Sequence, residues 1–378
     1  MEQYASHGIG AVEITPLYGV KGNQANNINF LSPKWMEMLR YVEAQGKRLG
    51  VQVDMNNGTG WPFGSPATPL EEAACKVVVV DSVFNSNALK NGGSVAAPAK
   101  EAKYSSLDFV MAYPKAVKGY KGGAVDVTSF VGSDGVLRWK TPKKGDWRII
   151  AIYVGRTRQQ VKRAAPGGQG YVIDHFDKTA VKHYLDIFDK AFATTNTPWP
   201  HSMFNDSYEV YGADWTPTLP QEFEKRRGYS LKENIDKLVD RDEKLVSDYR
   251  ETLSDMLLEN FTDQWAAWAH SHGMTVRNQA HGSPANLIDV YAAVDIPEIE
   301  GFGLSEFGIK GLRIDPGMTK LNDSDYSMLK YAPSAAHITG KKLVSSETFT
   351  WLTEHFRTSL SQMKPDLDLM FCAGVNHM

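Results

Sequence analysis

The sequence of 378 residues predicts an α/β protein, a (β/α)8 barrel of the TIM type with an inserted antiparallel β region. Strand-like and helix-like segments alternate over short connections in both outer parts of the chain, which is typical of parallel βαβ units. Between them lies a long stretch of short strand-like runs with turn signals and no convincing helix. Polar residues follow most of the strand-like runs, as in barrels whose chemistry lies at the carboxyl ends of the strands.

The first βα unit is the clearest. Residues 8–17 form a short apolar run rich in β-branched residues, which is typical of a buried strand. Ser32 and Pro33 then match an N-cap followed by proline in the first helical turn. Apolar residues continue at helical spacing as far as Gly50, a typical helix end, and residues 51–55 form the next apolar run. This pattern predicts a strand, a helix and a second, parallel strand.

The middle of the chain predicts a separate β-rich region. Residues 132–135 (GSDG) are typical of a hairpin turn. If this stretch were a loop, it would contain some 80 structureless residues, which is improbable in a compact domain. We therefore divide the chain into a first part of the barrel, residues 1–75, an inserted region, 76–160, and the remainder of the barrel, 161–378. Strands are expected in the insertion at residues 76–84, 107–112, 124–131, 135–141 and 147–154.

Alternation of helix and strand resumes after the insertion. The longest expected helix, residues 244–272, has apolar residues at three- and four-residue steps and stops at Gly273. About six βα units can be recognised, so either residues are missing from the ends of the barrel, with its first strand absent from the N-terminus, or some strands lack a clear pattern. The remaining expected elements are helices at 176–193 and 284–294, strands at 201–204, 274–279 and 342–346, a helix reaching about residue 363, and a last strand at 369–375.

Composition excludes several classes of protein. With 41 basic and 44 acidic residues the formal net charge is −3, which gives no strong field for nucleic acid or an anionic membrane. No run of about 18 apolar residues is present, so no membrane span is expected. Cys75 and Cys372 show no metal-ligand spacing, and two buried free thiols are expected. The polar N-terminus does not resemble a signal peptide.

Acidic, amide and histidine side chains follow nearly every expected strand. Cleavage of a glycosidic bond needs two carboxyl groups, one that donates a proton and one that activates water or attacks directly. Crowding of acids in a partly desolvated pocket raises the pKa of one of them. Trp61 and Trp351 are candidates for stacking on sugar faces. The ring of polar residues comprises Glu13, Asp54, Asn56, Asp174, His175, Asp206, Glu209, Asn278, His281, Glu298, Glu300, Glu347 and His377.

Other interpretations of these residues stay open. Glu13 could pair with an arginine, Asp174 and His175 could orient a loop, and His281 could support a neighbouring group. A metal-dependent hydrolase would use His175, His281, His377 and Asp206, although no HxH or HExxH motif is present. A carbohydrate-binding protein built on the inserted sheet is a further alternative, but binding alone rarely needs so many acids.

The segments together resemble glycoside hydrolase family 106, the α-L-rhamnosidases. The likeness runs from about Gly8 to the C-terminus, and it is specific as a combination rather than piece by piece. The matching stretches are GIGAVEITPLYGVKG, FLSPKWMEML, KRLGVQVDMNNGTGWPFG, YVIDHFDKTAVKHYL, FNDSYEV, RNQAHGSPANLIDVYAAVDIPEIEGF, SSETFTWL and GVNHM.

The resemblance implies an inverting hydrolase of terminal α-L-rhamnosyl residues on plant or bacterial glycans, assisted by calcium. Glu209 matches the general acid, and Glu347 is expected to be the base with Glu300 as its rival. Inversion predicts a separation of roughly 6.5–9.5 Å between the acid and base carboxyls. Glu298, Glu300 and Asn278 are the expected calcium ligands. The expected substrate-binding residues are Glu13, Asp54, Asn56, Trp61, Asp174, His175, Asp206, His281, Trp351 and His377.

The same resemblance carries expectations about the whole protein. A glycan substrate implies a periplasmic or secreted location. Family members are much longer than this chain, with a further barrel strand upstream and β-rich domains downstream. A barrel opened at one strand exposes an unpaired edge. We therefore expect this chain alone to be marginally stable and weakly active or inactive.

Overall fold

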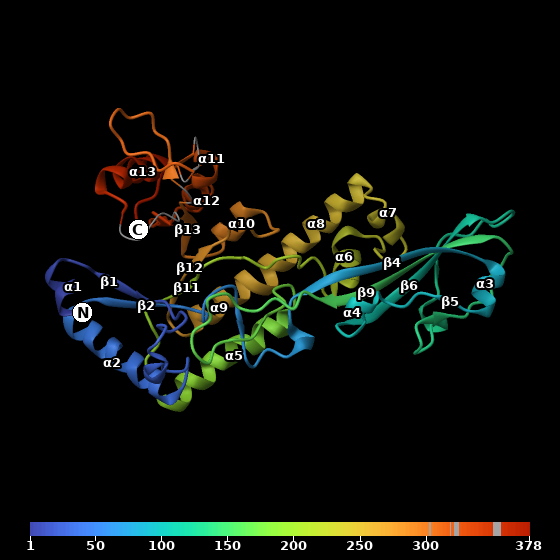
Figure 1. Cartoon of the computed structure of the whole chain (residues 1–378), viewed down its shortest axis with the longest axis horizontal. Coiled ribbons are helices and arrows are strands. Elements are labelled where there is room, and N and C mark those ends of the chain that lie inside the picture. The colour runs from blue at the N-terminus through green and yellow to red at the C-terminus, as the bar shows by residue number, and fades with distance from the viewer. Residues whose placement is uncertain (302–303, 318, 321–324, 351–356) are drawn as a thin grey trace.

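A six-stranded, curled parallel sheet forms the centre of the molecule in the computed structural model, which describes residues 1–301, 304–317, 319–320, 325–350 and 357–378 (Figure 1). The strand order is β1-β2-β11-β12-β13-β16, with β1 and β16 at opposite edges. The described part of the chain therefore forms an open half-barrel, and the complete eight-stranded ring is not confirmed. The strands are β1 (Ala11–Ile14), β2 (Gln52–Asn56), β11 (Ser202–Asn205), β12 (Thr275–Gln279), β13 (Ile296–Glu300) and β16 (Ser345–Glu347).

Helices cover the outer face of this sheet. The predicted first helix is confirmed as α2 (Pro33–Leu49): the Ser32 side chain accepts a hydrogen bond from the Trp35 N–H, and Gly50 ends the helix in the left-handed conformation. Helix α2 contacts α5 (Lys178–Thr195), and α5 contacts α9 (Gln264–Ser271). Apolar side chains between these helices and the strands make the main core.

The long helix predicted at residues 244–272 is confirmed, with one irregularity. It consists of α8 (Glu243–Leu257), a π-helical turn (Leu258–Asp263) and α9. Figure 1 shows it crossing from the parallel strands towards the inserted region. The π turn shifts the buried face of the helix, so a single helical period cannot describe its full length.

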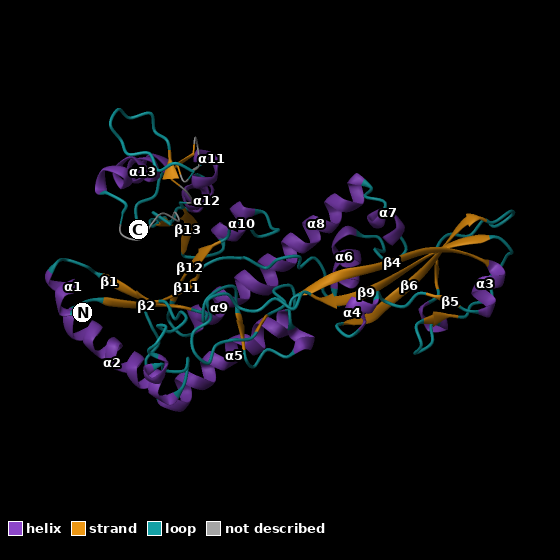
Figure 2. Ribbon diagram, in the orientation of Figure 1, coloured by secondary structure: helices purple, strands orange, loops and turns teal. Residues whose placement is uncertain are grey.

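The middle of the chain folds as an antiparallel sheet of order β4-β9-β6-β7, which extends away from the parallel strands (Figure 2). Strands β4 (Cys75–Asn85), β6 (Ser105–Ala116) and β9 (Asp146–Arg156) are long, whereas β7 (Val125–Asp126) is short. The sheet has its own core, which includes Trp139 and Trp147. The segments predicted as strands at 124–131 and 135–141 contain only the short strands β7 and β8 (Val136–Leu137), and Thr128–Phe130 is a 3-10 helix.

Two short helices in the insertion escaped prediction. Helix α3 (Ser86–Asn91) begins at Asn85, whose side chain accepts hydrogen bonds from the N–H groups of Asn87 and Ala88. Helix α4 is Ala99–Ala102. The other elements are α1 (Glu2–Ser6), α6 (Leu219–Arg227), α7 (Ile235–Val239), α10 (Leu287–Ala292), α11 (Tyr326–Leu329), α12 (Tyr331–Thr339), β3 (Gly64–Ser65), β5 (Gly93–Ser94), β10 (Tyr171–Val172), β14 (Leu304–Ser305) and β15 (Thr319–Lys320).

The strand predicted at residues 369–375 is wrong. These residues belong largely to α13 (Leu360–Ala373), whose buried side chains recur at helical spacing from Gln362 to Ala373. A short apolar run fits a buried strand and a buried helix equally well, and the capping box at Ser359 decides for the helix. The chain returns to the sheet only afterwards, where His377 bridges Ser345 in parallel.

Two further expectations concern cysteines and membranes. Both cysteines are free thiols, as expected, but only Cys75 is buried, whereas Cys372 lies on the exposed side of α13. Among the described residues, no helix combines the length and apolar character needed to cross a bilayer.

Candidate active site

The strand register brings the predicted acids to one face of the parallel sheet. Phe204 lies opposite Arg277, Gln279 opposite Glu298, and Glu300 opposite Glu347. Because residues directly opposite each other on neighbouring strands project to the same side, these side chains share the inner face of the half-barrel. All of them except Gln279 line a cleft of about 680 Å³. Its acidic lining comprises Glu13, Asp206, Glu209, Glu298, Glu300 and Glu347, and Trp61 lines it as well.

Arg277 organises the floor of this cleft. Its guanidinium pairs with Glu13 on one side and with Glu298 on the other, and it lies over the ring of Phe204 at 4.0 Å. Glu298 is almost fully buried, with a side-chain exposure of 1%, so its charge depends on this partner. The arginine partner considered for Glu13 is therefore present, and Glu13 lines the cleft at the same time.

Gln279 connects two of the acids. Its Nε2 donates to Oε1 of Glu298 at 3.0 Å and to Oε2 of Glu347 at 2.8 Å. Burial raises the pKa of Glu347, and the charges of Glu300 and Glu298 raise it further, while the hydrogen bond from Gln279 opposes the shift. Glu347 is thus a carboxyl whose basicity is increased by its surroundings.

The pKa of Asp206 is strongly raised in the cleft. Burial raises its pKa to about 8, helped by the negative charges of Glu347, Glu300, Glu298 and Glu209. No described basic residue forms an ion pair with Asp206. Burial, with these neighbouring charges, therefore favours the protonated form of Asp206 at neutral pH, whereas the sequence predicted the proton on Glu209.

Replacing Asp206 with asparagine is expected to stabilise the protein at pH 8 relative to the wild type but not at pH 4. The unfolded aspartate releases its proton near its ordinary pKa, whereas the folded one keeps it to about pH 8. Wild-type stability therefore falls as pH rises through this window, by at most about 1.4 kcal/mol per pH unit from this group. Urea unfolding of both proteins in EDTA-containing buffers measures the difference, and equal pH slopes would contradict the assignment.

Glu209 is held in the opposite state. Lys162 and the Tyr211 hydroxyl both donate to its Oε2, the tyrosine at 2.7 Å. Burial raises the pKa of Glu209, but these hydrogen bonds and the Lys162 charge outweigh it, so the pKa is lowered. In this arrangement the expected general acid is ionised.

The segment that carries Lys162 is fixed by backbone contacts. Lys162 and Trp61 exchange N–H···O bonds of 2.7 and 3.2 Å. Gly60 allows this close approach, because a Cβ there would lie 2.0 Å from the Lys162 carbonyl oxygen. Lys162 and Arg277 were both missed in the sequence. Arg277 lies two residues before Gln279 on the same strand and so faces the same side of the sheet. The alternation of strand faces could therefore have identified it.

His281 supports the cleft from behind. Its Nε2 lies 3.3 Å from Oε2 of Glu300, and its Nδ1 lies 3.4 Å from the buried Tyr291 hydroxyl. This geometry matches the supporting role that the sequence left open for His281.

Several predicted site residues lie elsewhere. Asp54 faces His201, with 3.0 Å between Oδ1 and Nδ1, and His377 lies near enough to lower its pKa, although burial dominates and raises it. Asn56 accepts the Gly58 N–H at the end of β2. None of these three predicted residues, Asp54, Asn56 and His377, lines the cleft. Trp351 lies outside the described residues.

Asp174 and His175 form part of the core. His175 is buried against Phe63 and Phe261, and burial lowers its pKa to about 3. Burial also raises the pKa of Asp174 to about 6, and its carboxylate accepts the Phe176 N–H at 3.0 Å. Asp174 and His175 are therefore buried and do not line the cleft.

Asn278 does not join Glu298 and Glu300. Its Oδ1 accepts a hydrogen bond of 2.7 Å from Asn205. Neighbouring positions on a strand face opposite sides, so Asn278 projects away from the face that carries Gln279. Among the described residues, no three or more His, Cys, Asp or Glu side chains are placed together to hold a metal ion.

A half-barrel with several carboxyls at the carboxyl ends of its strands is an arrangement that suits a glycoside hydrolase. Comparison with known proteins gives the family: residues 96–378 match the model of glycoside hydrolase family 106, described as alpha-L-rhamnosidase. The chain belongs to this family.

One solved structure and one curated protein are similar to this chain. The rhamnosidase of Novosphingobium sp. PP1Y has a similar structure, with a TM-score of 0.79 and 16% sequence identity over 100% of this chain and 52% of that one. A protein of Formosa agariphila called putative beta-glucuronidase is 24% identical over 87% of this chain and 30% of its own length. The chain thus spans about half of the structural relative and less than a third of the curated one.

Proposed function

We propose that this chain forms the catalytic part of an inverting α-L-rhamnosidase that removes terminal rhamnosyl residues from plant or bacterial glycans. The observation that carries the proposal is the convergence of Glu209, Glu347 and Glu300 in one cleft of a family 106 half-barrel. A glycan substrate also supports a periplasmic or secreted location for the protein.

Glu347 suits the role of base. Its raised pKa strengthens it as a proton acceptor, and Gln279 fixes the orientation of its carboxylate. Glu300, the rival, is partnered by His281. Water placed between Glu347 and the anomeric carbon would lose its proton to Glu347 as it attacks, on the side opposite the leaving group.

Glu209 suits the role of acid only after its ion pair is released. A carboxylate that accepts hydrogen bonds from Lys162 and Tyr211 holds no proton to donate. Arrival of the glycosidic oxygen beside Glu209 would displace Lys162, and the protonated Asp206 lies in the same cleft as a source of the proton.

Replacing Lys162 with glutamine is expected to move the alkaline limb of the kcat/KM profile to higher pH. Without the cation, the pKa of Glu209 rises, and the acid stays protonated over a wider range. Lys162→Arg keeps the charge and should leave the limb in place. An unshifted limb in Lys162→Gln would show that Lys162 does not govern the proton donor.

The calcium expected from the family fits part of the donor set. Oε1 of Gln279 is buried with no hydrogen-bond partner, and the Glu300 carboxylate, which lines the cleft, is a hard oxygen donor. Gln279 and Glu300 would hold the ion, with waters and sugar hydroxyls completing six to eight ligands. When bound, calcium would orient sugar hydroxyls and offset the repulsion among the acids. Glu298 and Asn278 suit it less, because their oxygens are engaged by Arg277 and Asn205.

Product stereochemistry tests the mechanism. Proton NMR of the first sugar released from 4-nitrophenyl α-L-rhamnoside should show the β-anomer before mutarotation. The rate should fall with EDTA and return with calcium. Initial release of the α-anomer would contradict the inverting mechanism, and a rate that is insensitive to EDTA would contradict the calcium assignment.

The metal-hydrolase alternative gains no support from the geometry. His175 lies in the aromatic core, His281 behind Glu300, and His377 near Asp54, so they do not converge with Asp206. A binding-only function is tested by the same assay, because it predicts sugar binding without turnover.

A further inference from the structure

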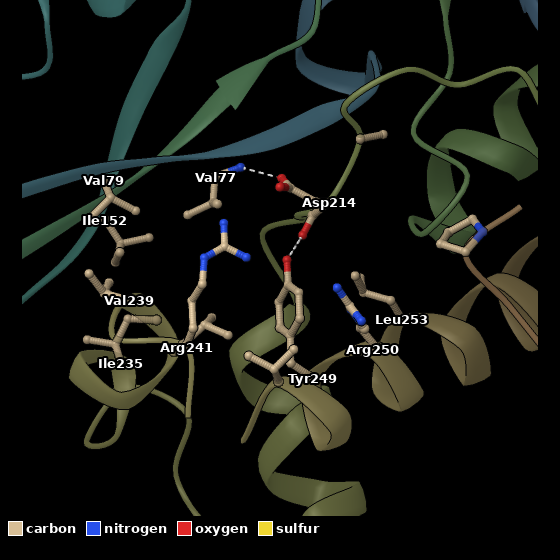
Figure 3. A pocket seen from close by; sticks show the side chains of 14 residues that line it. Val77, Val79, Ile152, Asp214, Ile235, Val239, Arg241, Tyr249, Arg250 and Leu253 are labelled. Atoms are coloured by element: carbon tan, nitrogen blue, oxygen red, sulfur yellow. Dashed lines mark hydrogen bonds between the residues drawn. The ribbon is translucent and has the colours of Figure 1, made fainter. Parts of the chain in front are cut away.

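A second cavity lies between the inserted sheet and the helices beside it, away from the acidic cleft (Figure 3). It measures about 460 Å³, within the range of small-molecule sites. Val77 and Ile152 form the wall on the side of the sheet, and Ile235, Val239 and Leu253 form the opposite wall. Neither this cavity nor its residues take part in the proposed glycosidase reaction.

The two walls are tied together at one end. The Asp214 carboxylate accepts the N–H of Val77 on β4 at 2.8 Å, and the Asp214 carbonyl oxygen accepts the hydroxyl of Tyr249 on α8. Figure 3 shows both bonds at the edge of the cavity. The cavity is therefore a preformed space, and its one carboxylate is already engaged by the backbone.

Two arginines line the cavity, and among the described residues neither forms an ion pair. Arg241 follows helix α7, and Arg250 lies on α8 beside Tyr249. Figure 3 shows the Arg241 side chain extending from the helix end towards Val77 and Ile152. Two guanidinium groups therefore lie beside apolar walls without an ion-pair partner among the described residues, and the Asp214 carboxylate in the same lining accepts the Val77 N–H.

Arg241 itself adopts the left-handed conformation at the end of helix α7. Arg241 has φ 60°, and the N–H groups of Arg241 and Asp242 donate to the carbonyl oxygens of Leu238 and Lys237. This pattern is the Schellman end of a helix, whose left-handed position is usually glycine. Arginine is less favourable than glycine in this backbone conformation.

We propose that this cavity is a binding site for a small aryl carboxylate, independent of the acidic cleft. The apolar walls suit an aromatic body, and arginine binds carboxylates through paired N–H donors. The lining offers few polar groups for the hydroxyls of a free sugar, which favours an aromatic ligand over a carbohydrate.

Fluorescence titration with 2-naphthoate, using the whole chain, tests this proposal. Saturable binding at one equivalent is expected, with at least tenfold weaker affinity for the neutral 2-naphthamide. Arg241→Asn removes the charge but tolerates the left-handed backbone, and Arg250→Gln removes the second charge; each should weaken 2-naphthoate at least tenfold. Lys237→Gln, an exposed cation on α7 outside the cavity, is the matched control and should change nothing.

Two further measurements keep the result interpretable. Thermal unfolding of each variant shows whether it remains folded, and Val246→Trp should block binding by filling the cavity without changing its charge. Equal affinity for naphthoate and naphthamide, or undiminished binding in folded Arg241→Asn and Arg250→Gln proteins, would overturn the proposal. Because these readouts need no glycosidase activity, failure of the proposed function leaves the test valid.

Discussion

Glu347→Gln should lower kcat/KM for 4-nitrophenyl α-L-rhamnoside by about 10²–10⁴-fold, the usual contribution of a general base. Glutamine keeps the shape of the side chain and can still meet Gln279, but it cannot accept the proton of the attacking water. Steady-state rates across pH 5–9, with calcium present, measure the effect. Glu37→Gln, an exposed acid on α2, is the matched control and should retain wild-type activity.

Glu300→Gln separates the two candidate bases. If Glu347 is the base, Glu300→Gln should mainly raise KM or the calcium concentration required, with a smaller loss of kcat. The reverse pattern, a large loss of kcat in Glu300→Gln and a small one in Glu347→Gln, would transfer the role to Glu300.

Arg277→Met should lower the free energy of unfolding by about 3–5 kcal/mol, because it leaves buried carboxylates without their cation. Glu298 has a side-chain exposure of 1% and Arg277 of 14%, so water cannot replace the lost partner. Urea unfolding at pH 7 measures the change.

Lys34→Met supplies the comparison, since it breaks a pair with Glu37 in which both side chains are more than half exposed. Exposed pairs contribute only about 0–1 kcal/mol. Similar losses for the two variants would show that Arg277 is not the anchor of the cleft floor. Without the arginine, the carboxyls that it neutralised take up a proton more readily. Part of the stability lost in Arg277→Met should therefore be recovered at pH 5.

Local signals in the sequence predicted most of the fold. The cap at Ser32, the proline after it and the stop at Gly50 define α2 closely, and the apolar steps of the long helix survive its π turn. The strand predicted at residues 369–375 was wrong, because a short apolar run does not show enough periods to distinguish a helix from a strand. The sequence also could not predict how many strands of the barrel pair, because closure depends on pairing between strands far apart in the chain.

The sequence predicted the acids of the site, but it did not identify Lys162 or Arg277 as their partners. Glu209, Glu300 and Glu347 follow strands and meet in the cleft, as the pattern of strand ends suggested. Lys162 arrives from the segment after the insertion, and its contact with Glu209 depends on tertiary pairing with Trp61. Protonation states were equally hidden: burial and four neighbouring charges single out Asp206, and no local motif records them.

Two chromogenic substrates test the proposed rhamnosidase activity directly on this chain: 4-nitrophenyl α-L-rhamnoside and 4-nitrophenyl β-D-glucuronide. The glucuronide is included because a relative is called putative beta-glucuronidase. Glu209→Gln and Glu347→Gln are measured beside the wild type, and a chain extended at both ends is included. We expect release of 4-nitrophenol from the rhamnoside alone, loss of that release in both variants, and higher activity of the extended chain. Turnover of the glucuronide in preference to the rhamnoside, or rhamnoside turnover that both variants retain, would contradict it.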